Sequence, residues 1–276
     1  MANKETITLV QAKANKLREL VLEMIGVGKA GHLGGSYSAA EIVSALYFSK
    51  MKLDPSNPKY PNRDRFLLSK GHAALIQYAA LTELGYIPAD AIAKTKSLGA
   101  MLQGHPDMHK TPGIEANTGS LGQGLSIACG MALGLKTDGK TNKVYVLIGD
   151  GEITEGQIWE AAMAAAVYGL DNLVAILDKN NIQATGTIKD TFDTNPVPEK
   201  WKAFGWEVFE LDGHDTAEIL DTLDKADTVK GKPVILIAHT VKGKGVDFAE
   251  HNAAYHNGIL THEQYESAMS QIRGAC

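Results

Sequence analysis

The chain is poor in the residues that mark several common classes of protein. It has two cysteines, too few for a disulfide framework. We expect Cys129, in an apolar stretch of small residues, to be a buried reduced thiol and the terminal Cys276 to be exposed. Its four arginines are scattered and its lysines do not cluster, which argues against nucleic-acid binding. No apolar run reaches the length of a membrane span and no signal peptide is visible, so we expect a soluble cytoplasmic protein.

The chain does have enough length and apolar content for a large core. It has 276 residues, 44% of them hydrophobic, with a formal net charge of −5. No repeat and no linker divides it, and we expect residues 1–276 to form a single domain. Strand and helix patterns alternate in the second half, which favours a doubly wound α/β fold, a parallel sheet with helices on both faces.

The predicted strands are Val144–Ile148, Leu173–Leu177, Glu207–Leu211 and Pro233–His239. The predicted helices span residues 8–26, 38–49, 72–84, 120–135, 155–167, 196–204 and 216–230.

Gly149-Asp150-Gly151 follows the first of these strands, where glycine lets the backbone approach a ligand closely. Asp150 is a hard carboxylate, and Mg²⁺ in proteins is usually held by one or two carboxylates together with phosphate oxygens. The amide oxygen of Asn180 and the carbonyl of Ile182, beyond the end of the next strand, would complete the ligand set, because ligands bind at the carboxyl ends of parallel strands. A plain glycine turn is the alternative for the tripeptide alone.

The order strand, Gly-Asp-Gly, helix, strand and Asn180-Asn181 resembles the signature of thiamine diphosphate enzymes. Further segments, in the same chain order and spread from residue 31 to residue 258, are similar to the transketolase family. They are Gly31-His32-Leu33-Gly34-Gly35, Leu68-Ser69-Lys70-Gly71-His72-Ala73, Gly104-His105-Pro106, Gly119-Ser120-Leu121-Gly122-Gln123-Gly124 and Tyr255-His256-Asn257-Gly258. Leu33 departs from the family pattern, which commonly has proline after the first histidine.

The resemblance implies binding of thiamine diphosphate with Mg²⁺, or another divalent cation such as Ca²⁺ or Mn²⁺. It also implies transfer of a two-carbon ketol group from a ketose phosphate to an aldose phosphate. In the family, the histidines matched by His32, His72, His105 and His256 lie near the thiazolium and the donor hydroxyls, where they recognise hydroxyls and move protons. A loop histidine satisfied by backbone is the alternative for any one of them. We favour that alternative for His109, His214, His239, His251 and His262.

Other matched positions are implied to contact the cofactor. Gly119 and Leu121 match residues that approach the aminopyrimidine and the diphosphate, as His72 and His256 also would. Glu155 matches a glutamate that meets a glutamate of the pyrimidine domain across the subunit interface. Stabilisation of a helix start is the alternative for Glu155, and it is our interpretation of Glu152.

Family members that fold from one chain are more than twice this long, and this chain resembles only their first domain. The resemblance therefore implies a separate partner chain with the pyrimidine and C-terminal domains, in an α2β2 assembly. The glutamate that activates the aminopyrimidine would lie on that partner, so we predict no turnover by this chain alone. We expect sugar phosphates as substrates, and neither nucleic acid nor membrane as partners.

Alternatives remain at this point. Deoxyxylulose-phosphate synthase and the alpha chain of a 2-oxoacid dehydrogenase share the cofactor signature. A split enzyme acting on a modified sugar would share this half of the sequence. The two non-enzymatic alternatives are a plain doubly wound α/β binding module and a non-catalytic regulatory subunit.

Overall fold

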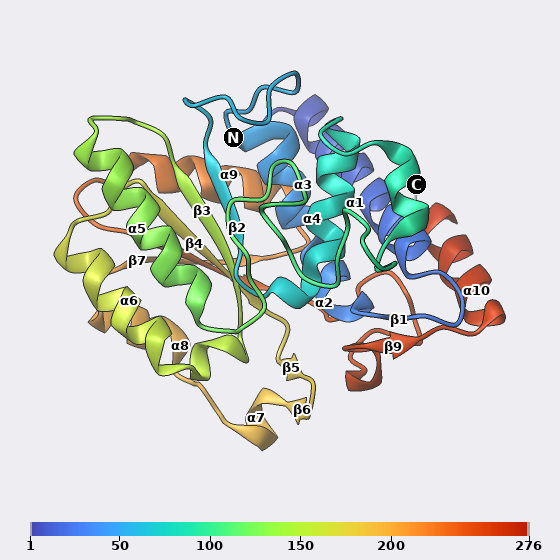
Figure 1. Ribbon diagram of the computed structural model, residues 1–276. Coiled ribbons are helices and arrows are strands. Elements are labelled where there is room, and N and C mark those ends of the chain that lie inside the picture. Colours follow the sequence, from blue (N-terminus) through green and yellow to red (C-terminus); the bar gives the residue numbers. More distant parts are fainter. Residues whose placement is uncertain (1, 275–276) are drawn as a thin grey trace.

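The computed structural model describes residues 2–274 and is built around a five-stranded parallel sheet, shown in Figure 1. The strand order is β2-β3-β4-β8-β7. In that order the bounds are Arg65–Leu68, Val144–Gly149, Leu173–Lys179, Val234–His239 and Glu207–Asp212. The predicted doubly wound α/β fold is confirmed, and each of the predicted strands is present within one or two residues.

Strand β2 was missed by the sequence analysis. It is only four residues long, begins with a charged residue and follows a turn-rich, proline-containing segment, so it has too few positions to show a strand period. Its strand conformation is fixed by pairing with β3, for example Leu67 with Val146, and not by a pattern in its own sequence. The sheet therefore extends one strand further, and β2 delivers the Ser69-Lys70-Gly71-His72 segment to the edge where β3 and β4 also end.

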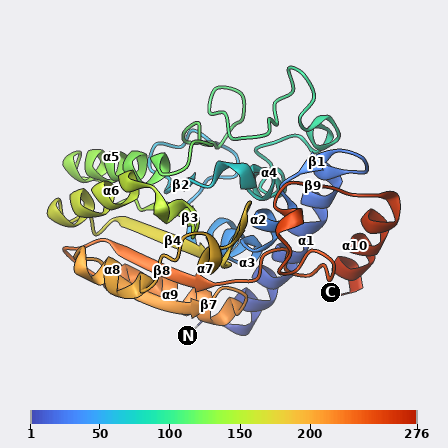
Figure 2. The same ribbon diagram turned by 90° about the horizontal axis from the view of Figure 1, so that it is seen from below.

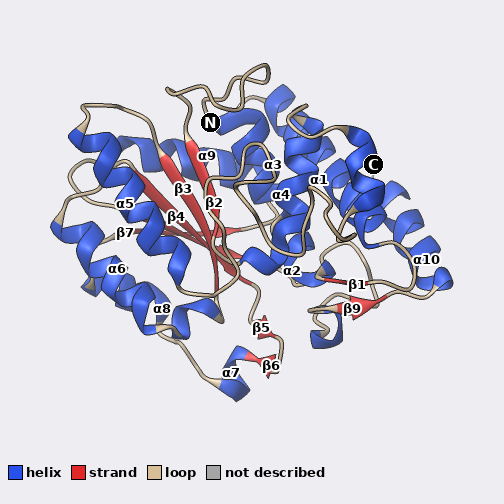
Figure 3. Ribbon diagram, viewed as in Figure 1, coloured by secondary structure: helices blue, strands red, loops and turns tan. Residues whose placement is uncertain are grey.

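Helices cover both faces of the sheet, as Figure 3 shows. Side chains alternate across a strand, and in β3 Val144, Val146 and Ile148 join one core while Tyr145 and Leu147 join the other. Helices α5, α6 and α8 pack on the first face. Helices α1, α3, α4 and α9 pack on the second face. Their bounds are Gln123–Thr137, Gly156–Val167, Val197–Ala203, Lys4–Ile25, Ala40–Ala45, Ala74–Glu83 and Thr216–Thr228.

The helix boundaries differ from the sequence prediction at their ends. Helix α1 begins at Lys4 rather than at residue 8, because the side chain of Asn3 caps it by accepting a hydrogen bond from the Thr6 N–H at 2.7 Å. The predicted helix 38–49 is α3 continued by a π-helical turn, Leu46–Lys50. The predicted helix 72–84 opens with a 3₁₀ turn, Gly71–Ala73, before α4.

Small elements outside the main sheet join distant parts of the chain. Strand β1, Ala30–Gly31, pairs antiparallel with β9, Gly258–Ile259, and Figure 2 shows the two side by side. Helix α10, His262–Gly274, packs on α1. The first and last of the matched histidine segments are thereby brought together. The remaining elements are α2, Leu33–Tyr37; the β5-β6 hairpin, Ile182–Gln183 and Gly186–Thr187; α7, Ile188–Thr191; and 3₁₀ turns Ala89–Lys94, Glu152–Thr154 and Ala253–Tyr255.

Two further expectations concern the cysteines and the membrane. Cys129 is a buried free thiol, as predicted, whereas Cys276 lies outside the described residues. Within residues 2–274, none of the helices has both the length and the apolar character needed to span a bilayer.

Candidate active site

Asp150 lies just beyond β3 and is buried, with 4% of its surface exposed. Its carboxylate accepts a hydrogen bond from the Gly151 N–H at 2.8 Å and a short one from the Asn181 N–H. Burial, and secondly the charge of Asp178, raise the pKa of Asp150 to about 6. Asn181 has a φ of 63°, in the left-handed region, and this turn aims its N–H at Asp150. The loop after β4 is thus folded onto the end of β3.

The other two predicted metal ligands lie on that same loop. Asn180 donates to an oxygen of Asp178 at 3.0 Å, and its own side-chain oxygen accepts from the Ile182 N–H at 3.1 Å. The carbonyl of Ile182 accepts from the Lys242 ammonium at 2.7 Å. No group of three or more His, Cys, Asp or Glu among the described residues is arranged to hold a metal ion. The predicted set is of another kind, since two of its three donors are amide and carbonyl oxygens.

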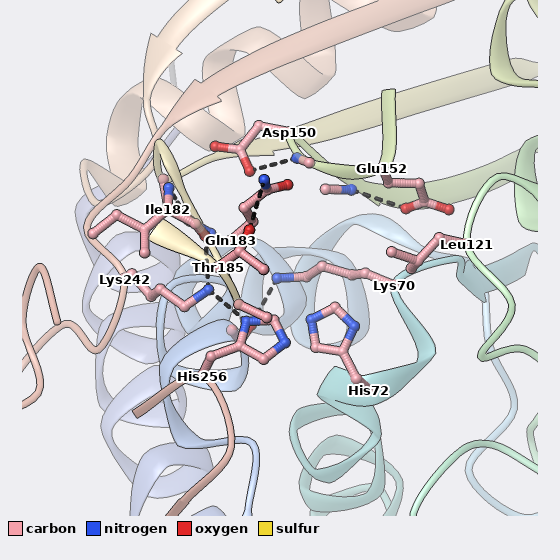
Figure 4. A pocket seen from close by; sticks show the side chains of 15 residues that line it. Lys70, His72, Leu121, Asp150, Glu152, Ile182, Gln183, Thr185, Lys242 and His256 are labelled. Atoms are coloured by element: carbon pink, nitrogen blue, oxygen red, sulfur yellow. Dashed lines mark hydrogen bonds between the residues drawn. The ribbon is translucent and has the colours of Figure 1, made fainter. Parts of the chain in front are cut away.

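A cavity of about 230 Å³ opens at this edge of the sheet, and Figure 4 shows the side chains that line it. It gathers residues from several loops that are distant in sequence. The predicted site residues among its lining are His72, Leu121, Gly149, Asp150, Gly151, Asn180, Ile182 and His256.

Two lysines that the sequence analysis gave no role also line the cavity. Lys70 forms a buried ion pair with Asp178 and donates to the Gly35 carbonyl at 2.7 Å. Lys242 is 2% exposed, and its burial, together with the charge of Lys70, lowers its pKa to about 8. In Figure 4 both ammonium groups lie between Asp150 and the imidazoles. Lys70 stands inside a quoted segment, and Lys242 follows β8 at the ligand-binding edge, so strand-end placement could have indicated both.

Four imidazoles lie next to one another beside these cations. The ring centroid of His72 is 4.8 Å from that of His256 and 5.3 Å from that of His32. His32 is in turn 5.6 Å from His256 and 6.2 Å from His105. The structure therefore assembles all four predicted histidines in one cluster, although His32 and His105 stand beyond the cavity lining.

These imidazoles are held in their neutral form. Burial first, and then nearby cations, lower the pKa of His72 to about 2 and those of His32 and His256 to about 4. Lys242 lies 2.9 Å from Nδ1 of His256. Because an ammonium has only donors, Nδ1 of His256 accepts and its hydrogen is carried on Nε2. A neutral imidazole with a fixed tautomer has one donor and one acceptor with which to handle a substrate hydroxyl.

Gly119 is required by the approach of His105. Its φ is +151°, and a Cβ there would lie 2.9 Å from Cδ2 of His105. Leu121, two residues later, lines the cavity. Gly119 thus acts through close packing, without lining the cavity itself.

Glu155 is exposed at the N-terminal end of α6 and does not line the cavity. It is the N-cap residue of α6 and makes no side-chain capping hydrogen bond, so the alternative of helix-start stabilisation rests on its charge alone. Its Cβ packs against Gly122, where an added Cβ would come within 2.8 Å.

Our interpretation of Glu152 as a helix-start residue is wrong. Glu152 is the first residue of a 3₁₀ turn, Glu152–Thr154, that precedes α6. Its side chain points inward and is 1% exposed. The carboxylate accepts from the Gly122 N–H at 2.9 Å, from the Gly149 N–H at 3.0 Å and, at short range, from the Ser69 hydroxyl. Glu152 therefore joins three of the loops that form the cavity.

Of the five histidines interpreted as structural, His214 has the clearest partners. Its Nε2 accepts from the Val241 N–H at 2.8 Å, and its Nδ1 lies 2.9 Å from Glu41. Backbone satisfaction of this histidine agrees with the expectation.

The parallel sheet, with a cavity at the carboxyl ends of its strands, defines a ligand-binding domain of the α/β class. The family model "Transketolase, thiamine diphosphate binding domain" matches residues 9–273. The chain therefore belongs to the transketolase family.

Known proteins similar to this chain fall into two groups by length. It is 46% identical to the 6-deoxy-6-sulfo-D-fructose transketolase subunit SqwG of Clostridium sp. (strain MSTE9), covering 95% of this chain and 96% of that protein. It is 42% identical to an apulose-4-phosphate transketolase subunit of Phocaeicola vulgatus, covering 96% and 94%. The crystal structure of transketolase from Campylobacter jejuni superposes with a TM-score of 0.91 at 34% identity, covering 96% of this chain but 43% of that one.

Proposed function

We propose that this chain is the N-terminal, diphosphate-binding subunit of a split transketolase that transfers a two-carbon ketol group between sugars. The observation that carries the proposal is the arrangement at the sheet edge. There the Asp150 carboxylate and two buried ammonium groups line one cavity. The neutral imidazoles of His72 and His256, which belong to the histidine cluster, line it as well. Such a site suits an anionic cofactor at one end and a polyhydroxylated substrate at the other.

The residues fit thiamine diphosphate with a divalent cation. Asp150, Asn180 and the Ile182 carbonyl would hold Mg²⁺, which prefers oxygen donors and shares them with phosphate. The Lys242 ammonium lies where it can balance the charge of a diphosphate, and Lys70, whose charge is paired with Asp178, lines the same cavity. When bound, the cofactor supplies the carbon–carbon bond cleavage and formation of ketol transfer. The chain's part is to bind it, orient it and shield it.

The imidazoles would handle the substrate. His256, with its hydrogen on Nε2, can donate to a hydroxyl or carbonyl oxygen of the sugar, while Lys242 holds the ring in place. His72 and His32 follow on in the cluster and, being neutral, can each accept one hydroxyl proton and donate another. His105, held against Gly119, would extend hydroxyl recognition further out. For Glu155, which is exposed, we propose contact with the partner chain.

A second chain would complete the site. The similar proteins of this length are named as transketolase subunits, and the chain spans 43% of the Campylobacter jejuni transketolase. We propose a partner that contributes the pyrimidine and C-terminal domains, in an α2β2 assembly. Helices α5 and α6 offer it a surface: Gly130 is exposed on α5, and Met163 and Val167 are 51% and 82% exposed on α6.

The sugar transferred is the finer part of the proposal. The relatives named above are called transketolases of 6-deoxy-6-sulfo-D-fructose and of apulose 4-phosphate. Both names describe modified sugars that carry an anionic group. Their similarity supports a modified, anionic sugar as substrate here, and xylulose 5-phosphate is the reference donor against which it is to be compared.

The test is ketol transfer to ribose 5-phosphate with thiamine diphosphate and Mg²⁺, by this chain alone and with its candidate C-terminal partner. Three donors are offered: xylulose 5-phosphate, 6-deoxy-6-sulfofructose and apulose 4-phosphate. We expect transfer only by the mixture. Transfer by the chain alone would overturn the half-site, and a mixture that binds the cofactor but transfers from none of the donors would move the search to other donor sugars.

A binding measurement tests the metal site independently of turnover. Asp150→Ala removes the carboxylate ligand at a strand end, so the assembled complex should lose Mg²⁺-dependent binding of thiamine diphosphate, measured by calorimetry. Asp90→Ala, at a side chain that is 79% exposed, is the matched control. Unchanged affinity in Asp150→Ala would remove Asp150 from the ligand set.

A further inference from the structure

Lys96 has a backbone conformation that side chains with a Cβ rarely adopt. Its φ is 64°, in the left-handed region, although it is not a glycine. The loop on either side is fixed: Lys96 N–H donates to the Leu102 carbonyl at 2.8 Å, and Leu102 and Thr95 are both buried. Such strain at a non-glycine residue persists only where the surroundings impose it, and it gathers at functional sites.

The side chain of Lys96 reaches toward the histidine cluster. Its Nζ donates to the Ala30 carbonyl at 2.8 Å, and Ala30 opens strand β1, which leads directly to His32. The charge of Lys96 is, after burial, the largest influence lowering the pKa of both His32 and His105. The ammonium is therefore anchored on the segment that carries His32, and its charge acts on the two imidazoles that lie beyond the cavity lining.

Within residues 2–274, this charge has no carboxylate to balance it. Lys96 is half-buried, and burial is the cause that lowers its pKa, with no carboxylate of those residues acting to raise it. Lys70, at the inner end of the site, is paired with Asp178, and Lys13 is paired with Glu83 at 2.7 Å. A partly desolvated ammonium without a counter-charge, held by a backbone carbonyl two residues before His32, is suited to an anionic ligand.

The site thus has cations at both ends of its imidazole cluster. Lys70 and Lys242 lie at the inner end with Asp150, where the cofactor diphosphate is proposed to bind. We propose that Lys96 forms an anion subsite at the outer end, which recognises the terminal phosphate or sulfonate of the sugar substrate. The subsite rests on the proposed function, since it takes the ketose to lie along the imidazoles, and it gives this chain a share in substrate selection.

Binding without turnover tests the subsite first. The full chain is titrated with ribose 5-phosphate, with 6-deoxy-6-sulfofructose and with uncharged ribose, and the signals of His32 and His105 are followed by NMR. The anionic sugars should shift these signals saturably, and ribose should not. Lys96→Met should weaken the anionic sugars by about 10- to 100-fold, the effect of losing one charge-assisted hydrogen bond. Lys96→Arg should largely retain them.

Lys94→Met is the matched control, since Lys94 is nearby in sequence, is 72% exposed and faces Asp90 at 3.9 Å. Equal shifts by ribose and the anionic sugars would overturn the subsite. So would full binding by Lys96→Met, or anionic sugars that leave the His32 and His105 signals unchanged. A response to one anionic sugar alone tells phosphate from sulfonate as the group selected.

Kinetics of the assembled complex give the second arm. Lys96→Met should raise the KM of anionic donors by about 10- to 100-fold with kcat little changed, because the contact is made equally in the ground state and the transition state. The KM of the uncharged donor erythrulose should be unchanged. An equal loss for charged and uncharged donors would contradict the subsite. If the wild-type complex transfers no ketol group, the proposed function fails, while the binding arm still decides the role of Lys96.

Discussion

The buried ion pair of Lys70 and Asp178 gives the sharpest stability prediction for this chain. The two side chains are 2% and 0% exposed. Asp178 also accepts from Ser38 at 2.7 Å, from Asn180 at 3.0 Å and, at short range, from Thr240. Removing one member of a buried pair costs about 3–5 kcal/mol, because the other charge stays buried without its partner. That is a large part of a typical unfolding free energy of about 5–15 kcal/mol.

Replacing Lys70 and replacing Asp178 should lower the free energy of unfolding by different amounts. Lys70→Met leaves Asp178 with its three other donors, so we expect a loss near the lower limit, about 3 kcal/mol. Asp178→Asn leaves the Lys70 ammonium with the Gly35 carbonyl and a neutral amide, so its loss should lie nearer about 5 kcal/mol. The loss of unfolding free energy in the double variant should be smaller than the sum of the two single losses by about 2 kcal/mol. The second substitution removes a charge that the first has already left without its partner.

The assay is urea unfolding followed by circular dichroism and by tryptophan fluorescence. Lys140→Met is the control, because Lys140 and its partner Asp138 are 40% and 65% exposed, and such a pair contributes about 0–1 kcal/mol. If Lys70→Met costs no more than Lys140→Met, or if the two single losses simply add, the ion pair is not the stabilising unit described here.

The pH dependence gives an independent check of the same pair. Burial acts to raise the pKa of Asp178, but the charge of Lys70 and the hydrogen bonds from Lys70, Thr240 and Ser38 outweigh it, and the pKa lies below the usual value. A carboxyl with a lowered folded-state pKa contributes stability above its unfolded pKa and loses it as the pH falls through the folded value. The deficit of Asp178→Asn should therefore be constant at neutral pH and shrink only in strong acid.

Three further predictions concern the site and its surface. In NMR titrations His256 should reach half protonation only near pH 4 and His72 only near pH 2. Because both folded pKa values lie below 6.5, stability falls as the pH drops from 6.5, through about 4 for His256 and about 2 for His72, and protonation of either ring at pH 6 would contradict the burial argument. Glu152→Gln should lose about 1–3 kcal/mol in urea unfolding, because its new amide donor faces hydrogen-bond donors; an unchanged midpoint would remove Glu152 as the link between loops. Gly130→Leu, where an added Cβ meets nothing within 4 Å, should leave the chain folded but block assembly with the second chain in light scattering, while Lys225→Leu on α9 should not; assembly by Gly130→Leu would exclude the α5 surface.

Local patterns in the sequence were enough for the fold class and for many of the residues that line the cavity. Strands β3, β4 and β8 are largely apolar runs that can be recognised without help from the rest of the chain, whereas β7, Glu207–Asp212, mixes charged and apolar residues. Asp150 and Asn180 were found because parallel strands end at one edge, so placing the strands also places the residues that follow them. Strand β2 and the inward turn of Glu152 were not found, since each depends on a neighbour: β3 for the first, and the 3₁₀ turn before α6 for the second.

What the sequence determined by itself is the parallel α/β sheet, the loops that follow its strands and the resemblance to transketolases, because strand period and motif order are local properties of the chain. The tertiary structure decided how those loops meet. The β1-β9 pairing brings His256 against His32, and the fold buries Lys70 and Lys242 against the cavity and, within residues 2–274, leaves Lys96, anchored on the segment that carries His32, without a carboxylate partner. Burial and nearby charges set the protonation states of these groups. Both depend on contacts between residues that are far apart in the sequence, so local sequence patterns do not predict them.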